Sequence, residues 1–146
     1  MGLDMYLIGD KYISEYDHSQ QGPDGRSLRV KRPVIDGFEI TSYKLDLGYW
    51  RKFGPLHDYI VKVFADGVDD CRPIDLDSDD CRRIAAALRD GGLPENEDVE
   101  RGCFFGSDEM WDEDRAQSEE HAKLFDKAAD FIDAAPWNSV TYVASW

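Results

Sequence analysis

The sequence predicts an α+β fold in a single domain spanning residues 1–146, and three features support this. Strand-like alternation occurs near both ends of the chain and in its centre, helix-like periodicity lies between these segments, and a regular βαβ repeat is missing. We therefore expect an antiparallel or mixed sheet of N-terminal, central and C-terminal strands, with about three helices packed on it. A chain of 146 residues with 42% hydrophobic residues can bury a real core.

The strands of this sheet are predicted from alternating or β-rich segments. The clearest are LDMYLIG (3–9), FEITSYKLDL (38–47) and SVTYVASW (139–146), and shorter extended segments are expected at 28–32, 71–76 and 103–107. Gly, Pro, Asp and Ser in DHSQQGPDGRS (17–27) indicate a polar loop. A final strand inside the sheet would hold the C-terminus in place.

Three helices are predicted from apolar residues repeated at helical spacing. The first starts near Pro55 and carries the stripe Leu56, Tyr59, Ile60 and Val63. The second is capped by Ser78, turns Cys81, Ile84, Ala85 and Leu88 inward, and ends at Gly91-Gly92. The third runs from about 117 to 134, with Leu124, Phe125, Ala128, Phe131 and Ile132 inward, and stops at Pro136.

The charge distribution bears on possible partners. The formal net charge is −14; residues 1–60 hold 8 basic and 9 acidic side chains, whereas residues 61–146 hold 9 and 22. Direct nucleic-acid binding is therefore not expected, since phosphate contacts need a positive surface. The acids form either a well-solvated surface or one that imitates nucleic-acid phosphates. With no apolar run of membrane-spanning length and no signal-peptide pattern, we expect a cytoplasmic protein without a membrane partner.

Metal and cofactor chemistry finds little support in the sequence. Cys71, Cys81 and Cys103 lack zinc-ligand spacing, so we interpret them as small buried apolar side chains. The aspartates at 75–80 fail the EF-hand pattern, and the acidic run 107–115 is more typical of an exposed loop or helix start than of a metal site. Neither GxxxxGK[ST] nor GxGxxG occurs. We predict no metal and no cofactor.

Aromatic and basic residues offer the best candidate binding site. Tyr49 and Trp50 precede Arg51 and Lys52, and aromatic faces beside cationic donors can stack a nucleobase and bind phosphate. The alternative is ordinary packing of these aromatics, several of the four tryptophans being buried. His57 is the one histidine near other reactive groups. It could act as a general acid or base, or it could be a hydrogen-bonded core residue. His18 and His121 are expected to face solvent.

Four segments, in this order, resemble a family of small phage and prophage proteins. They are MGLDMYL (1–7), YWRK (49–52) followed by Leu56-His57, GCFFGSDE (102–109), and the end of the chain from Tyr142 to Trp146. The family pattern reads MGLDMYL, YWRKAN-x-IHKWFV, GFFFGST-x-Y-x-x-W and YQSSW. This chain departs from it at Phe53-Gly54, Cys103 and Ala144, among other positions. Some members are labelled phosphoglycerate kinase, which a chain this short without a phosphate loop does not support.

The resemblance implies a phage or prophage accessory role, and three hypotheses follow. The first is a non-catalytic accessory protein, with counter-defence as one such role, that binds a small anionic or nucleotide-like ligand in an aromatic and basic pocket. The second is an acidic nucleic-acid mimic that blocks a host complex, as some anti-CRISPR proteins do. The third is a small enzyme with His57 as acid or base. The residues predicted to line the pocket of the first hypothesis are Tyr49, Trp50, Arg51, Lys52, His57, Phe105, Ser107 and Trp146.

Overall fold

A four-stranded antiparallel sheet forms the centre of the protein in a computed structural model that describes residues 2–146. Its strand order is β6-β1-β8-β7, and the strands are β1 (Asp4–Tyr12), β6 (Ser42–Arg51), β7 (Ile74–Leu76) and β8 (Asn138–Ser145). The predicted α+β class, with N-terminal, central and C-terminal strands in one sheet, is confirmed. The C-terminal strand β8 lies inside the sheet, between β1 and β7, so the end of the chain is held on both sides.

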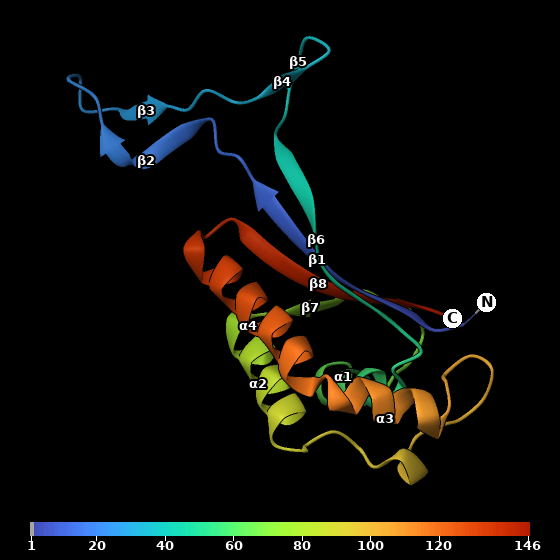
Figure 1. The fold of residues 1–146 in the computed structure, drawn as a ribbon. Helices are drawn as coiled ribbons and strands as arrows, with labels where there is room; N and C mark the ends of the chain where they lie inside the picture. The colour runs from blue at the N-terminus through green and yellow to red at the C-terminus, as the bar shows by residue number, and fades with distance from the viewer. Residues whose placement is uncertain (1) are drawn as a thin grey trace.

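The helices cover one face of this sheet (Figure 1). They are α1 (Gly54–Phe64), α2 (Ser78–Arg89), α3 (Asp108–Ala116) and α4 (Ser118–Ala134), with a short 3-10 turn, η1, at Asn96–Asp98. Strand residues that point to the helices are apolar, as alternation along a half-buried strand requires. The largest fully buried side chains of the core are Trp111, Tyr142, Phe53, Phe125, Leu3, Met5, Leu7, Leu56, Ile60, Ile84 and Val140.

The start of α2 is fixed by a reciprocal cap. The Asp80 amide donates to Asp77 Oδ1 at 2.8 Å, and the Asp77 amide donates to Asp80 Oδ2 at 3.0 Å. The cap is therefore Asp77 and not the predicted Ser78, and the carboxylates also complement the helix dipole. The predicted inward face of α2 is confirmed, because Cys81, Ile84, Ala85 and Leu88 are all buried.

Between β1 and β6 the chain leaves the body and forms a projecting arm, residues 13–41 (Figure 1). The arm contains two small antiparallel sheets, β2 (Tyr16–Gln21) with β3 (Ser27–Arg29), and β4 (Val34–Ile35) with β5 (Phe38–Glu39). Asp36 and Gly37 link β4 to β5 with φ values of 53° and 82°, as the two-residue turn of a tight hairpin requires. The polar loop predicted over 17–27 is therefore largely strand.

One other local prediction was wrong. Residues 103–107 do not form a strand; they belong to a tight turn closed by the bridge between Gly102 and Gly106. The acidic run 107–115, expected to be an exposed loop or a helix start, does start a helix, α3, which ends at Ala116 before α4 begins. Alternation alone did not distinguish a turn rich in aromatics from a strand.

Burial also differs from expectation for several side chains. Cys81 is buried, but Cys71 and Cys103 are exposed. His121 is largely buried and accepts a hydrogen bond at Nδ1 from Trp50 Nε1 at 3.0 Å, so it does not face solvent. The expectation that several tryptophans are buried is confirmed for Trp50 and Trp111.

Candidate functional site

Three segments that lie far apart in the sequence meet around Trp111. The Leu3 amide donates to the Phe104 carbonyl at 2.7 Å, and the Lys52 amide donates to the Leu3 carbonyl at 2.7 Å. The Trp111 indole N–H is shared between the carbonyls of Lys52 at 2.9 Å and Phe105 at 3.1 Å. A buried indole needs such acceptors. The start of β1, the end of β6 and the turn at 102–106 are therefore joined at one buried side chain.

Two glycines allow this close packing. A Cβ on Gly106, whose φ is 109°, would lie 2.5 Å from the Lys52 carbonyl oxygen and 2.6 Å from Trp111 Nε1. A Cβ on Gly54, at the start of α1, would lie 2.8 Å from Trp111 Cζ2. Only glycine leaves room for the indole and its two acceptors at these positions.

A polar network centred on His57 lies beside the turn at 102–106, on the side that faces β8. His57 lies in α1 and is buried; its Nδ1 is 2.8 Å from Tyr142 Oη, and its Nε2 is 2.9 Å from Asp69 Oδ2. The other oxygen of Asp69 accepts from Trp146 Nε1 at 3.2 Å. The Phe105 ring stacks on the imidazole, with centroids 6.4 Å apart, and contacts the Trp146 ring at 5.6 Å.

The hydrogen-bond partners determine where the protons lie in this network. A carboxylate oxygen accepts, so the hydrogen bond to Asp69 places a proton on His57 Nε2, and the Tyr142 hydroxyl, which can donate or accept, completes the partnership at Nδ1. Burial, and secondarily the Asp69 charge, raise the pKa of Tyr142 well above its usual value. Both imidazole nitrogens are thus engaged by side chains of the protein, and the phenol stays protonated.

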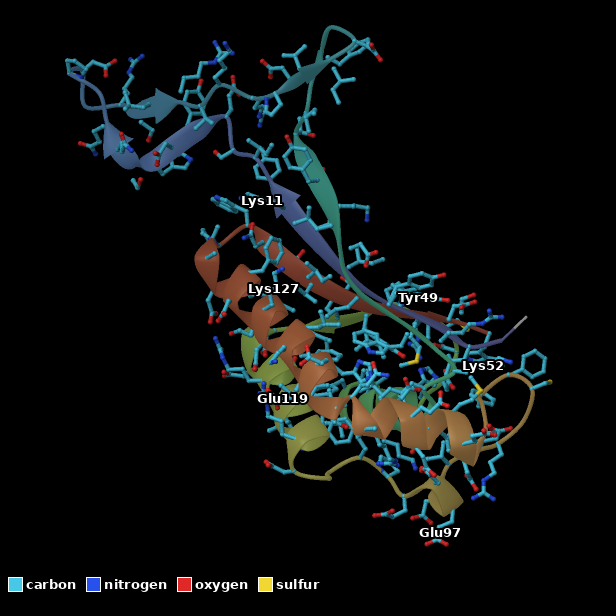
Figure 2. The ribbon with its side chains drawn as sticks, viewed as in Figure 1. Lys11, Tyr49, Lys52, Glu97, Glu119 and Lys127 are labelled. Carbon is cyan, nitrogen blue, oxygen red and sulfur yellow. The ribbon has the colours of Figure 1, made fainter. Side chains whose placement is uncertain are left out.

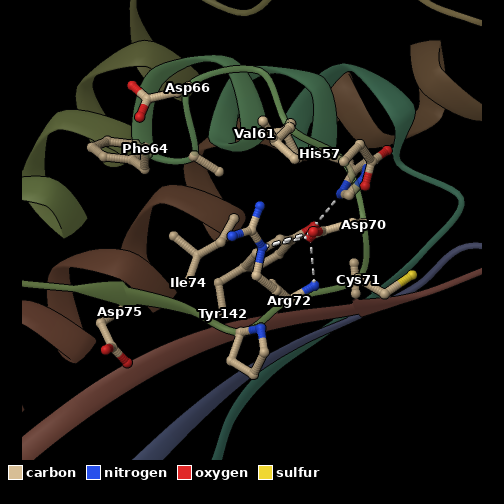
Figure 3. A pocket seen from close by; sticks show the side chains of 15 residues that line it. His57, Val61, Phe64, Asp66, Asp70, Cys71, Arg72, Ile74, Asp75 and Tyr142 are labelled. Atoms are coloured by element: carbon tan, nitrogen blue, oxygen red, sulfur yellow. Dashed lines mark hydrogen bonds and ion pairs between the residues drawn. The ribbon is translucent and has the colours of Figure 1, made fainter.

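His57 and Tyr142 form part of the wall of a cavity of about 470 Å³. The cavity lies between α1, the loop that follows it and strands β7 and β8 (Figure 3). Apolar side chains that line it come from all of these elements: Val61, Phe64, Ala65, Val68, Pro73, Ile74 and Ala144. This volume is in the range of small-ligand sites.

The charged groups of the cavity are mostly negative. Four aspartates line it, Asp66, Asp69, Asp70 and Asp75, against one guanidinium, Arg72. Arg72 Nε is 2.7 Å from Asp70 Oδ2, and Figure 3 shows the guanidinium lying between α1 and Ile74. This contact is the largest of the effects that lower the pKa of Asp70. The four aspartates and Arg72 together give a formal charge of −3.

The predicted pocket residues divide among several places. Trp50 packs in the core, stacked on Phe125 with ring centroids 5.2 Å apart. Strand alternation turns its neighbours Tyr49 and Arg51 to the other face of the sheet, where Tyr49 donates to Asp4 at 2.6 Å (Figure 2). These three residues therefore do not share a recess with His57.

Lys52 and Ser107 line a different, shallower recess of about 510 Å³ beside the start of α3. His57, Phe105 and Trp146 do come together, through Asp69, next to the acidic cavity. The structure thus brings three of the eight predicted side chains into one cluster.

Several residues of the cavity were not predicted as site residues. Asp69, Asp70 and Arg72 lie in a loop with two left-handed residues, Asp66 and Cys71, and no spacing rule connects that loop to α1. Tyr142 was noted only as part of the terminal motif. The alternation of β8 could have predicted that Tyr142 points into the core, but its contact with His57 depends on the tertiary fold.

The described residues offer no further chemical signature. Residues 2–146 include no group of three or more His, Cys, Asp or Glu side chains placed to hold a metal ion. Over the same range, no helix has the length and apolar character to cross a membrane. Comparisons with protein-family models, with curated proteins and with solved structures give no match.

Proposed function

We propose that this chain is a non-catalytic binding protein whose acidic cavity receives a positively charged group on an apolar stem. The observation that carries the proposal is the lining of the cavity, an apolar floor from α1 and β7 beside four aspartates and one arginine. An alkylammonium or alkylguanidinium group matches both parts. Such a group is offered by a small amine or by a Lys or Arg side chain of a peptide.

Electrostatics favour this ligand over the anionic one expected from the sequence. The one cation of the lining, Arg72, is already within 2.7 Å of Asp70, so it offers little net positive potential. The other three aspartates are not neutralised by it, and a recess with low-dielectric walls concentrates their field. Arg51 and Lys52, on which an anionic site would depend, do not line this cavity.

The hydrogen bonds of His57 support a binding role over catalysis. A general base needs a nitrogen directed at the bound molecule, but both nitrogens of this imidazole are within 2.9 Å of Tyr142 or Asp69. The network instead anchors Asp69, and with it the loop that forms the cavity rim. Together with the resemblance to phage proteins, this supports an accessory role in which binding a host component is itself the activity.

The test is an NMR titration of the 15N-labelled protein with four probes of equal stem length. These are n-butylammonium, n-butylguanidinium, n-butanol and butyrate, each followed through the amide shifts of residues 65–75. The proposal expects both cations to shift these amides saturably, and the alcohol and carboxylate not to do so. Saturable butyrate binding with no response to either cation would contradict it.

A substitution and a pair of peptides sharpen this test. Asp75→Asn should weaken binding of the cations by about two- to fivefold, the effect of one partly exposed charge, whereas Asp24→Asn in the arm should not. Gly-Gly-Arg-Gly-Gly, compared with its Gln counterpart, distinguishes the two sources of the cation. Binding of butylguanidinium but not of the Arg peptide indicates a small-molecule ligand. An equal loss of cation affinity in Asp75→Asn and Asp24→Asn would contradict the proposed site.

A second candidate function is imitation of nucleic acid by the acidic surface. Residues 95–114 contain nine Asp or Glu and one Arg, and eight of these nine acids are exposed. Such a surface suits a basic groove on a partner, and binding should then weaken steeply as salt rises. Retention of nucleic-acid-binding proteins from a host lysate at 50 mM but not 500 mM salt, lost on competition with DNA, would support this role. Salt-independent retention would count against it.

A further inference from the structure

The arm, residues 13–41, is an ordered element with no partner in its own chain to cover it. Backbone hydrogen bonds run across it from Ile13 to Thr41, from Val30 to Glu15 and from Ile40 to Pro33, each at 2.8 Å. Arg32 braces its base, where Nε donates to the Ile13 carbonyl at 3.0 Å. Figure 1 shows the arm projecting away from the sheet and helices. Its shape is therefore held by its own contacts, and within residues 2–146 neither of its two small sheets joins the main sheet.

The tip of the arm exposes apolar side chains. In the β4-β5 hairpin, Val34, Ile35 and Phe38 are 59%, 60% and 78% exposed. Tyr12 and Tyr43, at the base of the arm, are also exposed. Single exposed apolar residues are ordinary, but a two-stranded hairpin that presents three together is typical of an interaction surface.

Beside this tip lies the most basic stretch of the chain. Residues 26–32, RSLRVKR, contain four cations and no acid. The side chains of Arg26 and Arg29 are 87% and 70% exposed, and their contacts with Asp24 and Glu15 are exposed ion pairs of small energy. The other half of the molecule, residues 61–146, has a net charge of −13. The stretch 26–32 is thus complementary in charge to the body of the same protein, whereas the arm as a whole, with five acids and four cations, is close to neutral.

We propose that the arm docks on the acidic helical half of a second copy of this chain. The basic stretch 26–32 lies against the acids of η1 and α3, and the tip of the arm covers apolar side chains exposed beside them, Phe104 and Met110. A two-fold pair satisfies both arms at once, since each copy offers one arm and one acidic face. The complementary charges attract the copies, and the apolar tip stabilises the complex.

The first experiment measures the mass of the full chain in solution by light scattering after size-exclusion chromatography, from 5 to 500 µM. The proposal expects a dimer whose dissociation constant is at least tenfold higher in 500 mM than in 50 mM salt. Phe38→Ser and Arg29→Glu should each give monomers with an unchanged circular dichroism spectrum. Val68→Ser, an exposed apolar residue outside the arm, and Arg29→Lys, which keeps the charge, should remain dimeric. A monomer throughout this range would overturn the proposal.

The second experiment locates the contact. A zero-length carbodiimide cross-link in a mixture of 14N- and 15N-labelled protein should join Lys31 of one copy to acids within 95–114 of the other. Cross-links of this kind between differently labelled copies support the proposal. A dimer that survives Arg29→Glu and is cross-linked only arm to arm would overturn docking on the acidic face. Neither experiment depends on ligand binding in the cavity, so the two proposals fail separately.

Discussion

The packing of Gly106 against Trp111 leads to a quantitative prediction for Gly106→Ala. The new Cβ would lie 2.5 Å from the Lys52 carbonyl oxygen and 2.6 Å from Trp111 Nε1, so the turn or the indole must move. Movement weakens the two hydrogen bonds of the indole, each of which contributes about 0.5–1.5 kcal/mol. The φ of 109° adds a backbone penalty of about 1–3 kcal/mol for any side chain. We expect a total loss of about 2–6 kcal/mol in the free energy of unfolding.

Gly102→Ala is the matched control for this prediction. Gly102 is in the same turn and has a φ of 144°, but its Cβ would meet nothing within 4 Å. It should incur only the backbone penalty, about 1–3 kcal/mol. Urea unfolding followed by circular dichroism gives both values, and a red shift in tryptophan emission should accompany Gly106→Ala alone. Equal losses in the two variants would refute the idea that crowding of Trp111 determines the cost.

Three further predictions concern the polar network, a buried thiol and the sheet face opposite the helices. Tyr142→Phe should lower the free energy of unfolding by about 1–3 kcal/mol, because Nδ1 of buried His57 loses its 2.8 Å partner. Burial raises the pKa of Cys81 to about 12 from 9, so the folded protein keeps a proton that the unfolded chain loses. The contribution of Cys81 to the free energy of unfolding is therefore complete below pH 9 and falls by roughly 1.4 kcal/mol per pH unit between pH 9 and 12. Cys81→Ala should remove this contribution from the slope of the unfolding free energy against pH, measured by urea titrations with reductant. Arg51→Ala should change stability by less than about 0.5 kcal/mol and leave cation binding unchanged, because its contact with Asp4 is a long, exposed 3.9 Å pair.

Each of these has a control and a contrary result. Tyr49→Phe also removes a phenol hydroxyl, but at an exposed position, and should have little effect; a loss equal to that of Tyr142→Phe would mean that burial does not matter. Cys103→Ala should keep the alkaline slope, since this thiol is exposed; loss of the slope there would contradict the assignment to Cys81. A marked loss of cation binding in Arg51→Ala would show that Arg51 belongs to the binding site, contrary to this prediction.

The fold could be predicted from local patterns to a considerable extent. The inward face of α2 and the alternation of β8 each predicted an element and its buried side. For α1 the stripe predicted the helix and the burial of Leu56 and Ile60, but His57 and Val61 are buried where Tyr59 and Val63 were expected. The arm could not be predicted in this way. Its strands are mostly exposed on both faces. Polar segments such as DHSQQ therefore lack the alternation of apolar and polar residues that is found in a strand packed on a core.

The candidate site was harder to predict than the fold. Trp50 and Arg51 are adjacent in sequence, but a strand places adjacent side chains on opposite faces, so they could not share a pocket once β6 extended to Arg51. The loop that carries Asp69 contains Asp66-Gly67, a pair that predicts a turn, but no local pattern predicts that this turn brings Asp69 to His57. Main-chain groups of Leu3, Lys52 and Phe105 meet near Trp111, but this meeting depends on the tertiary fold and could not be predicted from any one segment.

The most direct test of the cation-binding account is the affinity for n-butylguanidinium of Arg72→Gln compared with that of the unmodified chain. Arg72 holds Asp70 by a 2.7 Å contact, so its removal frees one more carboxylate and deletes the only guanidinium of the cavity. The account predicts binding about two- to fivefold tighter in the variant, measured by the same amide shifts. Weaker cation binding in Arg72→Gln, or loss of butyrate binding that the unmodified chain possesses, would contradict it.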